Sequence, residues 1–141
     1  MPQLSRWYLR AAMLHLGGAL VLGLLLQIPS ARSSFPFIAA SFPTLLHLLV
    51  VGWITQVIFG VAYWMFPRYS AEQPRGSERL GWVTFVALNA GMVLRLAGEP
   101  AQRLGRDAGG LLVASALLQL VAGWAFILNT WPRLRERQCP G

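Results

Sequence analysis

The chain has 141 residues, of which 55% are hydrophobic and only 12% are charged. Soluble domains carry about 25% charged residues, so this composition indicates a multi-pass membrane protein with little chain outside the bilayer. The formal net charge of +7 is the difference between 12 arginines and 5 aspartates and glutamates. Because these arginines lie in short connections at predicted helix ends, they are interpreted as topology signals, and no nucleic-acid partner is expected.

The predicted fold class is all-α, a single four-helix transmembrane bundle over residues 1–141 with both termini cytoplasmic. The apolar segments that would span the bilayer cover about residues 5–28, 43–66, 78–97 and 108–131. In this topology the inner arginines are Arg6, Arg10, Arg68, Arg75, Arg79, Arg133, Arg135 and Arg137. The outer ones are Arg32, Arg95, Arg103 and Arg106. This excess inside favours a multi-pass protein of a bacterial inner (cytoplasmic) membrane in that orientation.

The first predicted helix begins at about Ser5, its expected N-cap, and ends before Pro29. Its apolar run is longer than the roughly 7–15 residues of a signal-peptide core, so we expect it to be retained. His15 is its ionisable group at membrane depth. The residues on the same face are mostly small: Ala11, Ala12, Gly18, Ala19, Leu22 and Gly23. That face suits a close helix neighbour or a flat ligand beside the imidazole.

The second predicted helix carries His47 one turn below its start at Pro43. The connection before it, residues 29–42, is unusually apolar and is expected to cover a site beneath it. A regular helix would place His47 on one face with Val51, Ile54, Thr55 and Ile58. The opposite face would carry Gly52, Gln56 and Gly60, whose spacing of four is typical of a helix-packing seam.

The third predicted helix begins at Ser77 or Glu78 and ends at about Ala97. Asn89 is its buried polar residue, and Arg95 is expected to extend towards the interface. The fourth helix, followed by a short basic tail, contains Gln119 and Asn129 as polar insertions. With these boundaries the carboxylates, Glu72, Glu78, Glu99, Asp107 and Glu136, all fall in connections or in the tail. A proton relay or cation-coupled transport is therefore not expected.

The chain lacks phosphate-binding-loop, serine-esterase and zinc-protease motifs, and its single cysteine, Cys139, is expected to be an inert thiol in the tail. Two imidazoles at membrane depth suit b-type haem, which needs axial nitrogens, an apolar slot and arginines near its propionates. The candidate haem-iron ligands are His47 and His15, and Arg95 and Arg103 are the candidate propionate partners. The alternative is that each histidine only hydrogen-bonds a neighbouring helix.

Depth leaves two arrangements of these ligands open. At about 1.5 Å rise per residue, His15 and His47 differ in depth by roughly 9 Å across the bilayer. Tilted helices would let them bind one iron from opposite sides. Otherwise each would serve a different haem, with the second ligand supplied by another subunit.

The segment HLLVVGWITQVIFGVAYWMFP, from His47 to Pro67, resembles the second helix of subunit I in the haem-copper oxidase superfamily, which includes the nitric oxide reductases. It also resembles small four-helix membrane proteins described as oxidase subunit I-like. The resemblance covers this helix only, and it implies that His47 is an axial ligand of haem b. The third and fourth helices contain no histidine, so the chain is not expected to be an oxidase on its own.

The expected function is therefore a membrane-embedded haem b protein, related to oxidase subunit I, for electron transfer or haem-based sensing. Four helices enclose a haem poorly, so a homo-oligomer in the lipid bilayer is expected. A respiratory complex or an electron-donor protein would be the partner. The alternative is a cofactor-free accessory or assembly subunit of a respiratory membrane complex.

Overall fold

The computed structural model describes residues 1–67 and 75–134. Within these residues, 4 helices are long and apolar enough to cross a membrane, so the predicted all-α fold of four membrane spans is confirmed. The predicted tail thiol, Cys139, lies outside the described residues, as do Arg68, Glu72, Arg135, Glu136 and Arg137.

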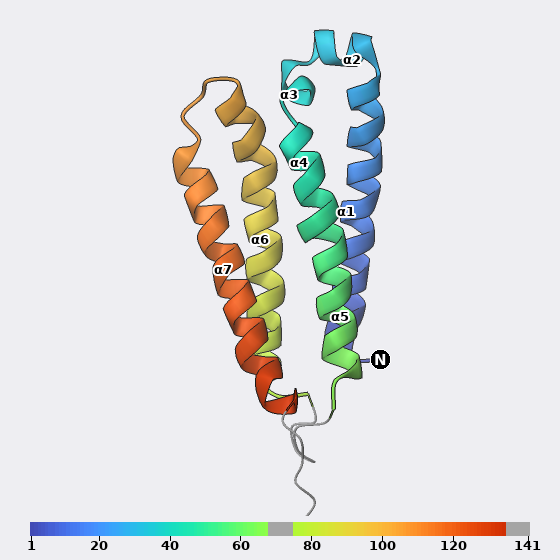
Figure 1. Cartoon of the computed structure of the whole chain (residues 1–141), viewed down its shortest axis with the longest axis vertical. Coiled ribbons are helices and arrows are strands. Elements are labelled where there is room, and N and C mark those ends of the chain that lie inside the picture. Colours follow the sequence, from blue (N-terminus) through green and yellow to red (C-terminus); the bar gives the residue numbers. More distant parts are fainter. Residues whose placement is uncertain (68–74, 135–141) are drawn as a thin grey trace, which may run out of the picture.

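The four spans form two helical hairpins (Figure 1). The elements in chain order are α1 (Gln3–Gln27), α2 (Pro29–Ser34), α3 (Pro36–Ala39), α4 (Phe42–His47), the π-helical η1 (Leu48–Thr55), α5 (Gln56–Met65), α6 (Glu78–Arg103), α7 (Gly109–Thr130) and the 3₁₀ turn η2 (Trp131–Leu134). One hairpin pairs α1 with the continuous helix formed by α4, η1 and α5. The other hairpin pairs α6 with α7, and the start of α1 lies at the same end of the bundle as η2.

The first hairpin closes along the predicted seam of Gly52, Gln56 and Gly60, which is confirmed. A Cβ atom added to Gly60 would lie 2.8 Å from Cβ of Tyr8, and one added to Gly52 would lie 2.8 Å from Cγ of His15. Gln56 between them is fully buried, at 0% exposure. The two glycines therefore allow α1 to approach the second span at a distance that no other residue would permit.

The middle of the second span is π-helical, and this changes the faces expected for a regular helix. The hydroxyl of Thr55 donates to the carbonyl of Val50, five residues earlier, at 2.9 Å. Wider turns between His47 and Gln56 rotate the later residues relative to the earlier ones. Ile54 and Ile58 are 44% and 56% exposed, and the His47 side chain is 33% exposed, so the shared face stays a prediction.

The third span continues past its predicted end at Ala97 and reaches Arg103. Gly98 lies inside the helix and does not end it. A Cβ atom added there would lie 2.9 Å from Cδ2 of Leu112 on α7, so the role of this glycine is to allow close packing of α6 against α7. The helix ends instead at Gly105, whose φ of +75° is the left-handed conformation that glycine favours. The amides of Gly105 and Arg106 donate to the carbonyls of residues 102 and 101, which is the Schellman pattern.

Of the two predicted helix starts, the one at Ser5 is wrong and the one at Ser77 or Glu78 is confirmed. Ser5 is not an N-cap: α1 begins at Gln3 after Pro2, and Ser5 is fully buried within its first turns. Ser77 does cap α6, because its hydroxyl accepts a hydrogen bond from the amide of Leu80 at 3.4 Å.

Arg133, expected in the basic tail, is instead buried against the end of the second span. Its guanidinium donates to the carbonyls of Phe66 at 2.6 Å, Pro67 at 3.0 Å and Tyr63 at 3.3 Å. A cation in this position satisfies carbonyls that have no partner within the helix and lies at the negative end of the helix dipole. Arg133 therefore links the end of the second hairpin to the end of the first through these hydrogen bonds.

Gly60→Ala tests the close approach of α1. The added methyl group would overlap the Tyr8 side chain, and overpacking of this kind costs about 1–3 kcal/mol. We expect a lower thermal midpoint of the detergent-solubilised protein. Gly17→Ala is the matched control, because no atom lies within 4 Å of a Cβ added there. Equal midpoints for the two variants would contradict this packing.

Candidate functional site: two buried histidine networks

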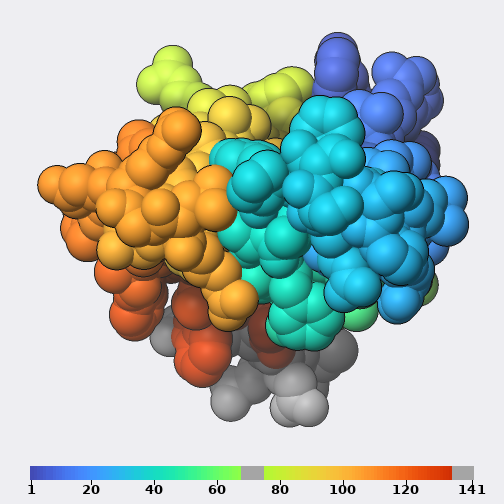
Figure 2. All heavy atoms as spheres, turned by 90° about the horizontal axis from the view of Figure 1, so that it is seen from above, coloured from blue at the N-terminus to red at the C-terminus, as the bar shows by residue number. Residues whose placement is uncertain are grey.

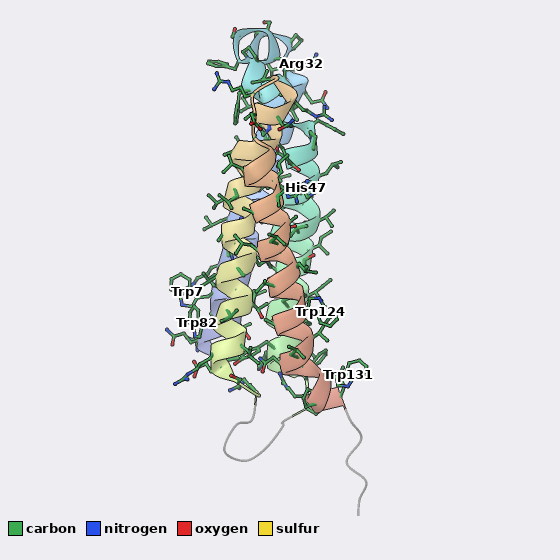
Figure 3. All side chains as sticks on the ribbon, turned by 90° about the vertical axis from the view of Figure 1, so that its left-hand side faces the viewer. Trp7, Arg32, His47, Trp82, Trp124 and Trp131 are labelled. Carbon is green, nitrogen blue, oxygen red and sulfur yellow. The ribbon has the colours of Figure 1, made fainter. Side chains whose placement is uncertain are left out.

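One set of polar side chains, the His47 cluster, joins the two hairpins towards the end that carries α2 and α3. It consists of His47 on α4, Arg95 and Glu99 on α6, and Ser115 on α7. Figure 3 shows His47 in the same half of the molecule as Arg32, away from the labelled tryptophans. Glu99 is 8% exposed and Ser115 is 0% exposed, whereas the His47 side chain is 33% exposed, so the cluster is buried at α6 and α7 and partly exposed at His47.

The two ring nitrogens of His47 have different partners. Nδ1 lies 2.8 Å from Oε1 of Glu99 and 3.0 Å from the carbonyl oxygen of Pro43. Both partners are acceptors, so Nδ1 carries a proton that it donates to them. Nε2 lies 3.4 Å from Nη1 of Arg95, which is a donor only, so Nε2 is the unprotonated nitrogen. The cluster thus holds His47 as a neutral imidazole whose lone pair points towards the guanidinium.

Arg95 is directed into the protein, and the prediction that it extends to the interface is wrong. Its Nη1 donates to Oε1 of Glu99 at 3.1 Å, one turn along α6. Its Nε donates to Oγ of Ser115 at 3.2 Å, and this hydroxyl donates in turn to the carbonyl of Gly91 at 2.7 Å. A charge at this depth needs such partners, because leaving it unpaired in a medium of low polarity is costly.

Glu99 is the functional candidate that the sequence interpretation missed. Because the third span was expected to end at Ala97, Glu99 was placed in a connection, and this placement is wrong. Glu99 lies within α6 and inside a candidate membrane span. Its Oε2 is buried and has no hydrogen-bond partner among the described residues. The available signal was the spacing of Arg95 and Glu99, which places opposite charges one helical turn apart.

A second set, the His15 network, joins the hairpins nearer the middle of the bundle. It consists of His15 on α1, Gln56 on α5 and Asn89 on α6. The side-chain amides of Gln56 and Asn89 exchange two hydrogen bonds, with donor–acceptor distances of 3.1 and 3.3 Å. Nε2 of Gln56 also lies 3.1 Å from Nδ1 of His15.

A backbone carbonyl determines the tautomer of His15 through this network. Nδ2 of Asn89 donates to the carbonyl of Phe85 at 2.8 Å, which fixes which way the Asn89 amide faces. The reciprocal pair then fixes the amide of Gln56, with its NH₂ group facing His15. Because this group only donates, Nδ1 of His15 must accept, and the proton of a neutral His15 lies on Nε2. The two histidines therefore have opposite tautomers.

The structure does not bring the predicted site residues into one group. His47 and Arg95 are in contact, whereas His15 belongs to the separate network with Gln56 and Asn89. Arg103 is exposed and lines a cleft of about 450 Å³ together with Arg32 at the end of the bundle. Figure 2 shows that end, where the α2–α3 segment lies beside the connection between α6 and α7.

His15 borders a groove of about 410 Å³ between α1 and α4. Its walls are mostly apolar and come from several elements: Leu14, His15, Gly18 and Leu22 of α1, Phe37 and Ile38 of α3, Ser41, Thr44, Leu48, and Leu96 of α6. Phe37 and Ile38 of α3, in the apolar first connection, line the groove, and the prediction that this connection covers a site stays a prediction. Gly18 adds no side chain to it, as the small face of α1 suggested.

No protein-family profile, no curated protein and no solved structure matches this chain.

Glu99→Leu tests the contribution of the His47 cluster to stability. Removing the carboxylate leaves the Arg95 guanidinium without its counter-ion, and breaking a buried ion pair in this way costs about 3–5 kcal/mol. We expect a fall in the free energy of unfolding in detergent that is of this order. Glu78→Gln is the control, because Glu78 is exposed at the start of α6.

The double variant Arg95→Met, Glu99→Leu separates the ion pair from packing. It removes both charges, so most of the lost stability should return. A double variant as unstable as Glu99→Leu would contradict the pairing, and so would a single variant as stable as the unchanged protein.

Proposed function

We propose that the chain is a membrane-embedded haem b protein in which His47 supplies an axial nitrogen, and that it serves electron transfer or haem-based sensing. The observation that carries this proposal is the tautomer of His47. Its Nδ1–H group is held by Pro43 and Glu99, which leaves Nε2 with the lone pair that a metal ion requires. Metal-ligating histidines in general donate their other ring N–H to a carbonyl or a carboxylate.

The residue types around His47, an imidazole and two arginines, are those that such a group would need. A bound haem would supply reversible one-electron chemistry or a site for a gas, and its propionates would need cations. Arg95 already lies beside Nε2, and its guanidinium would have to leave that nitrogen when iron binds there. A propionate would give Arg95 a new partner of opposite charge, and Arg103 lies further towards the same end of the chain's third span. Oε1 of Glu99 would still accept the Nδ1 proton of His47.

The described residues offer no second histidine in contact with His47 that would bind the same iron. His15 was the expected ligand in the same or a neighbouring subunit. In the tautomer favoured by Gln56, the Nε2 of His15 carries a proton, and its Nδ1 already accepts a hydrogen bond. His15 would serve as a ligand only after this network rearranged. Five-coordinate iron, or a sixth ligand from a second copy in a homo-oligomer, is therefore the arrangement that we favour.

A cofactor-free accessory or assembly subunit of a respiratory membrane complex is the second candidate. What favours it is the completeness of the polar pairing, because Nε2 of His47 is already within reach of a donor from Arg95. In this alternative the His47 cluster only holds the two hairpins together. Both candidates place the chain in a bacterial inner membrane.

The orientation is open to a simple measurement. We propose that both termini are cytoplasmic, because arginines are more numerous at that end. A reporter enzyme that is active only in the cytoplasm should then be active when it is fused after Gly141. Activity of a reporter that requires the periplasm would contradict this topology.

The haem proposal is tested by the absorption spectrum of protein purified from haem-replete cells. We expect a Soret band, which His47→Ala should abolish because the axial bond is lost. His15→Ala is the matched control for removal of an imidazole. It should keep the haem if His47 is the principal ligand. No Soret band in the unchanged protein, or full haem content with an unaltered spectrum in His47→Ala, would refute the proposal and favour the cofactor-free subunit.

A further inference from the structure

Two arginines from opposite hairpins line one cleft at the end of the bundle that carries α2 and α3. Arg32 lies in the last turn of α2, and Arg103 lies in the last turn of α6. The cleft has a volume of about 450 Å³. The rest of its lining consists of small or apolar residues: Pro36, Ala39, Ala40 and Leu104. The fold thus brings together two cations that are far apart in the sequence, at the end of the molecule seen in Figure 2.

Neither of these guanidiniums has a counter-ion in the described part of the chain, where the ion pairs involve other residues. The carboxylates on either side of Arg103 in the sequence have their own partners. Glu99 pairs with Arg95, and Asp107 accepts a hydrogen bond from a backbone amide at 3.4 Å. Two like charges in one cleft repel each other, so an anion bound between Arg32 and Arg103 would relieve this repulsion and accept charge-assisted hydrogen bonds.

The position of the cleft along the bundle favours a membrane lipid over a soluble anion. The candidate membrane spans on this side end at Gln27 and Arg103 and begin again at Phe42 and Gly109. The cleft therefore lies at the ends of the spans, at the level where lipid headgroups meet the hydrocarbon core.

The α2–α3 side of the cleft also carries exposed aromatic side chains. Phe35 and Phe37, the neighbours of Pro36 in the sequence, are 60% and 49% exposed. Side chains this apolar gain free energy when lipid rather than water covers them. A phospholipid would supply both an anionic group for the arginines and apolar chains for the surface beside them.

From these observations we propose that the cleft binds the headgroup of an anionic phospholipid, whose phosphate oxygens accept hydrogen bonds from Arg32 and Arg103. The planar guanidinium suits this role because its N–H donors match two oxygens of one phosphate. An anionic lipid is favoured over a zwitterionic one, because the lining includes no carboxylate that would receive an ammonium group. Arg32 has no part in the haem proposal, so the two proposals can fail separately.

Native mass spectrometry of the full-length protein in a non-ionic detergent tests this site. With equal amounts of phosphatidylglycerol and phosphatidylcholine present, we expect phosphatidylglycerol to be retained preferentially. Arg32→Gln and Arg103→Gln should each weaken its binding about tenfold, because a charged hydrogen-bond donor is lost. Arg106→Gln is the matched control, because it removes the same charge at the same end of the bundle, and Arg106 does not line the cleft.

The three arginines are exposed, so none of these variants should lower the thermal midpoint. The Soret absorbance of Arg32→Gln should equal that of the unchanged protein, which keeps this test independent of haem. Inorganic phosphate, added at the same concentration as the lipid, distinguishes a soluble anion from a lipid and should not displace phosphatidylglycerol. Equal retention of the two lipids, an equal loss of binding in Arg106→Gln, or displacement by inorganic phosphate would overturn the proposal.

Discussion

Polar contacts between the two hairpins are the constraint on which the rest of this structure depends. In a bilayer, apolar faces gain little by leaving lipid for one another, so packing, close approach and interhelical hydrogen bonds must hold spans together. The first hairpin closes on Gly52 and Gly60. The two hairpins then meet through the His47 cluster, through Gln56 with Asn89, and through Arg133 at the far end. Along the second span these contacts involve His47 of α4, Gln56 at the start of α5 and Phe66 just after α5.

The same bonds determine the chemistry of the histidines. Glu99 and Pro43 take the proton of His47 on Nδ1, whereas Gln56, oriented by Asn89, requires His15 to accept on Nδ1. The two imidazoles of the chain therefore lie in different surroundings: His47 is next to a carboxylate and a guanidinium, whereas His15 is next to a side-chain amide.

Periodicity and length sufficed to predict the spans, the glycine seam and the start of the third helix at Ser77 or Glu78. Predictions from periodicity failed where a local backbone feature, a π-helical stretch or a C-terminal capping motif, changed the course or the length of a helix. A π-helical stretch replaces the regular turns that were expected in the second span, and α6 continues beyond Gly98 to a Schellman motif at Gly105, so it includes Glu99. The pairing of Arg95 with Glu99 could be suspected from spacing. The contacts of Arg133 with the end of the second span could not be predicted, because they depend on how helix ends far apart in the sequence meet in the fold.

The tautomers of the two histidines are the most direct test of this account. A chain with only two histidines gives a simple nitrogen-15 spectrum when labelled histidine is incorporated, and His15→Gln assigns the signals. In haem-free protein we expect His47 to be protonated on Nδ1 alone and His15 on Nε2 alone. The same tautomer at both positions, or a doubly protonated His47, would contradict the account.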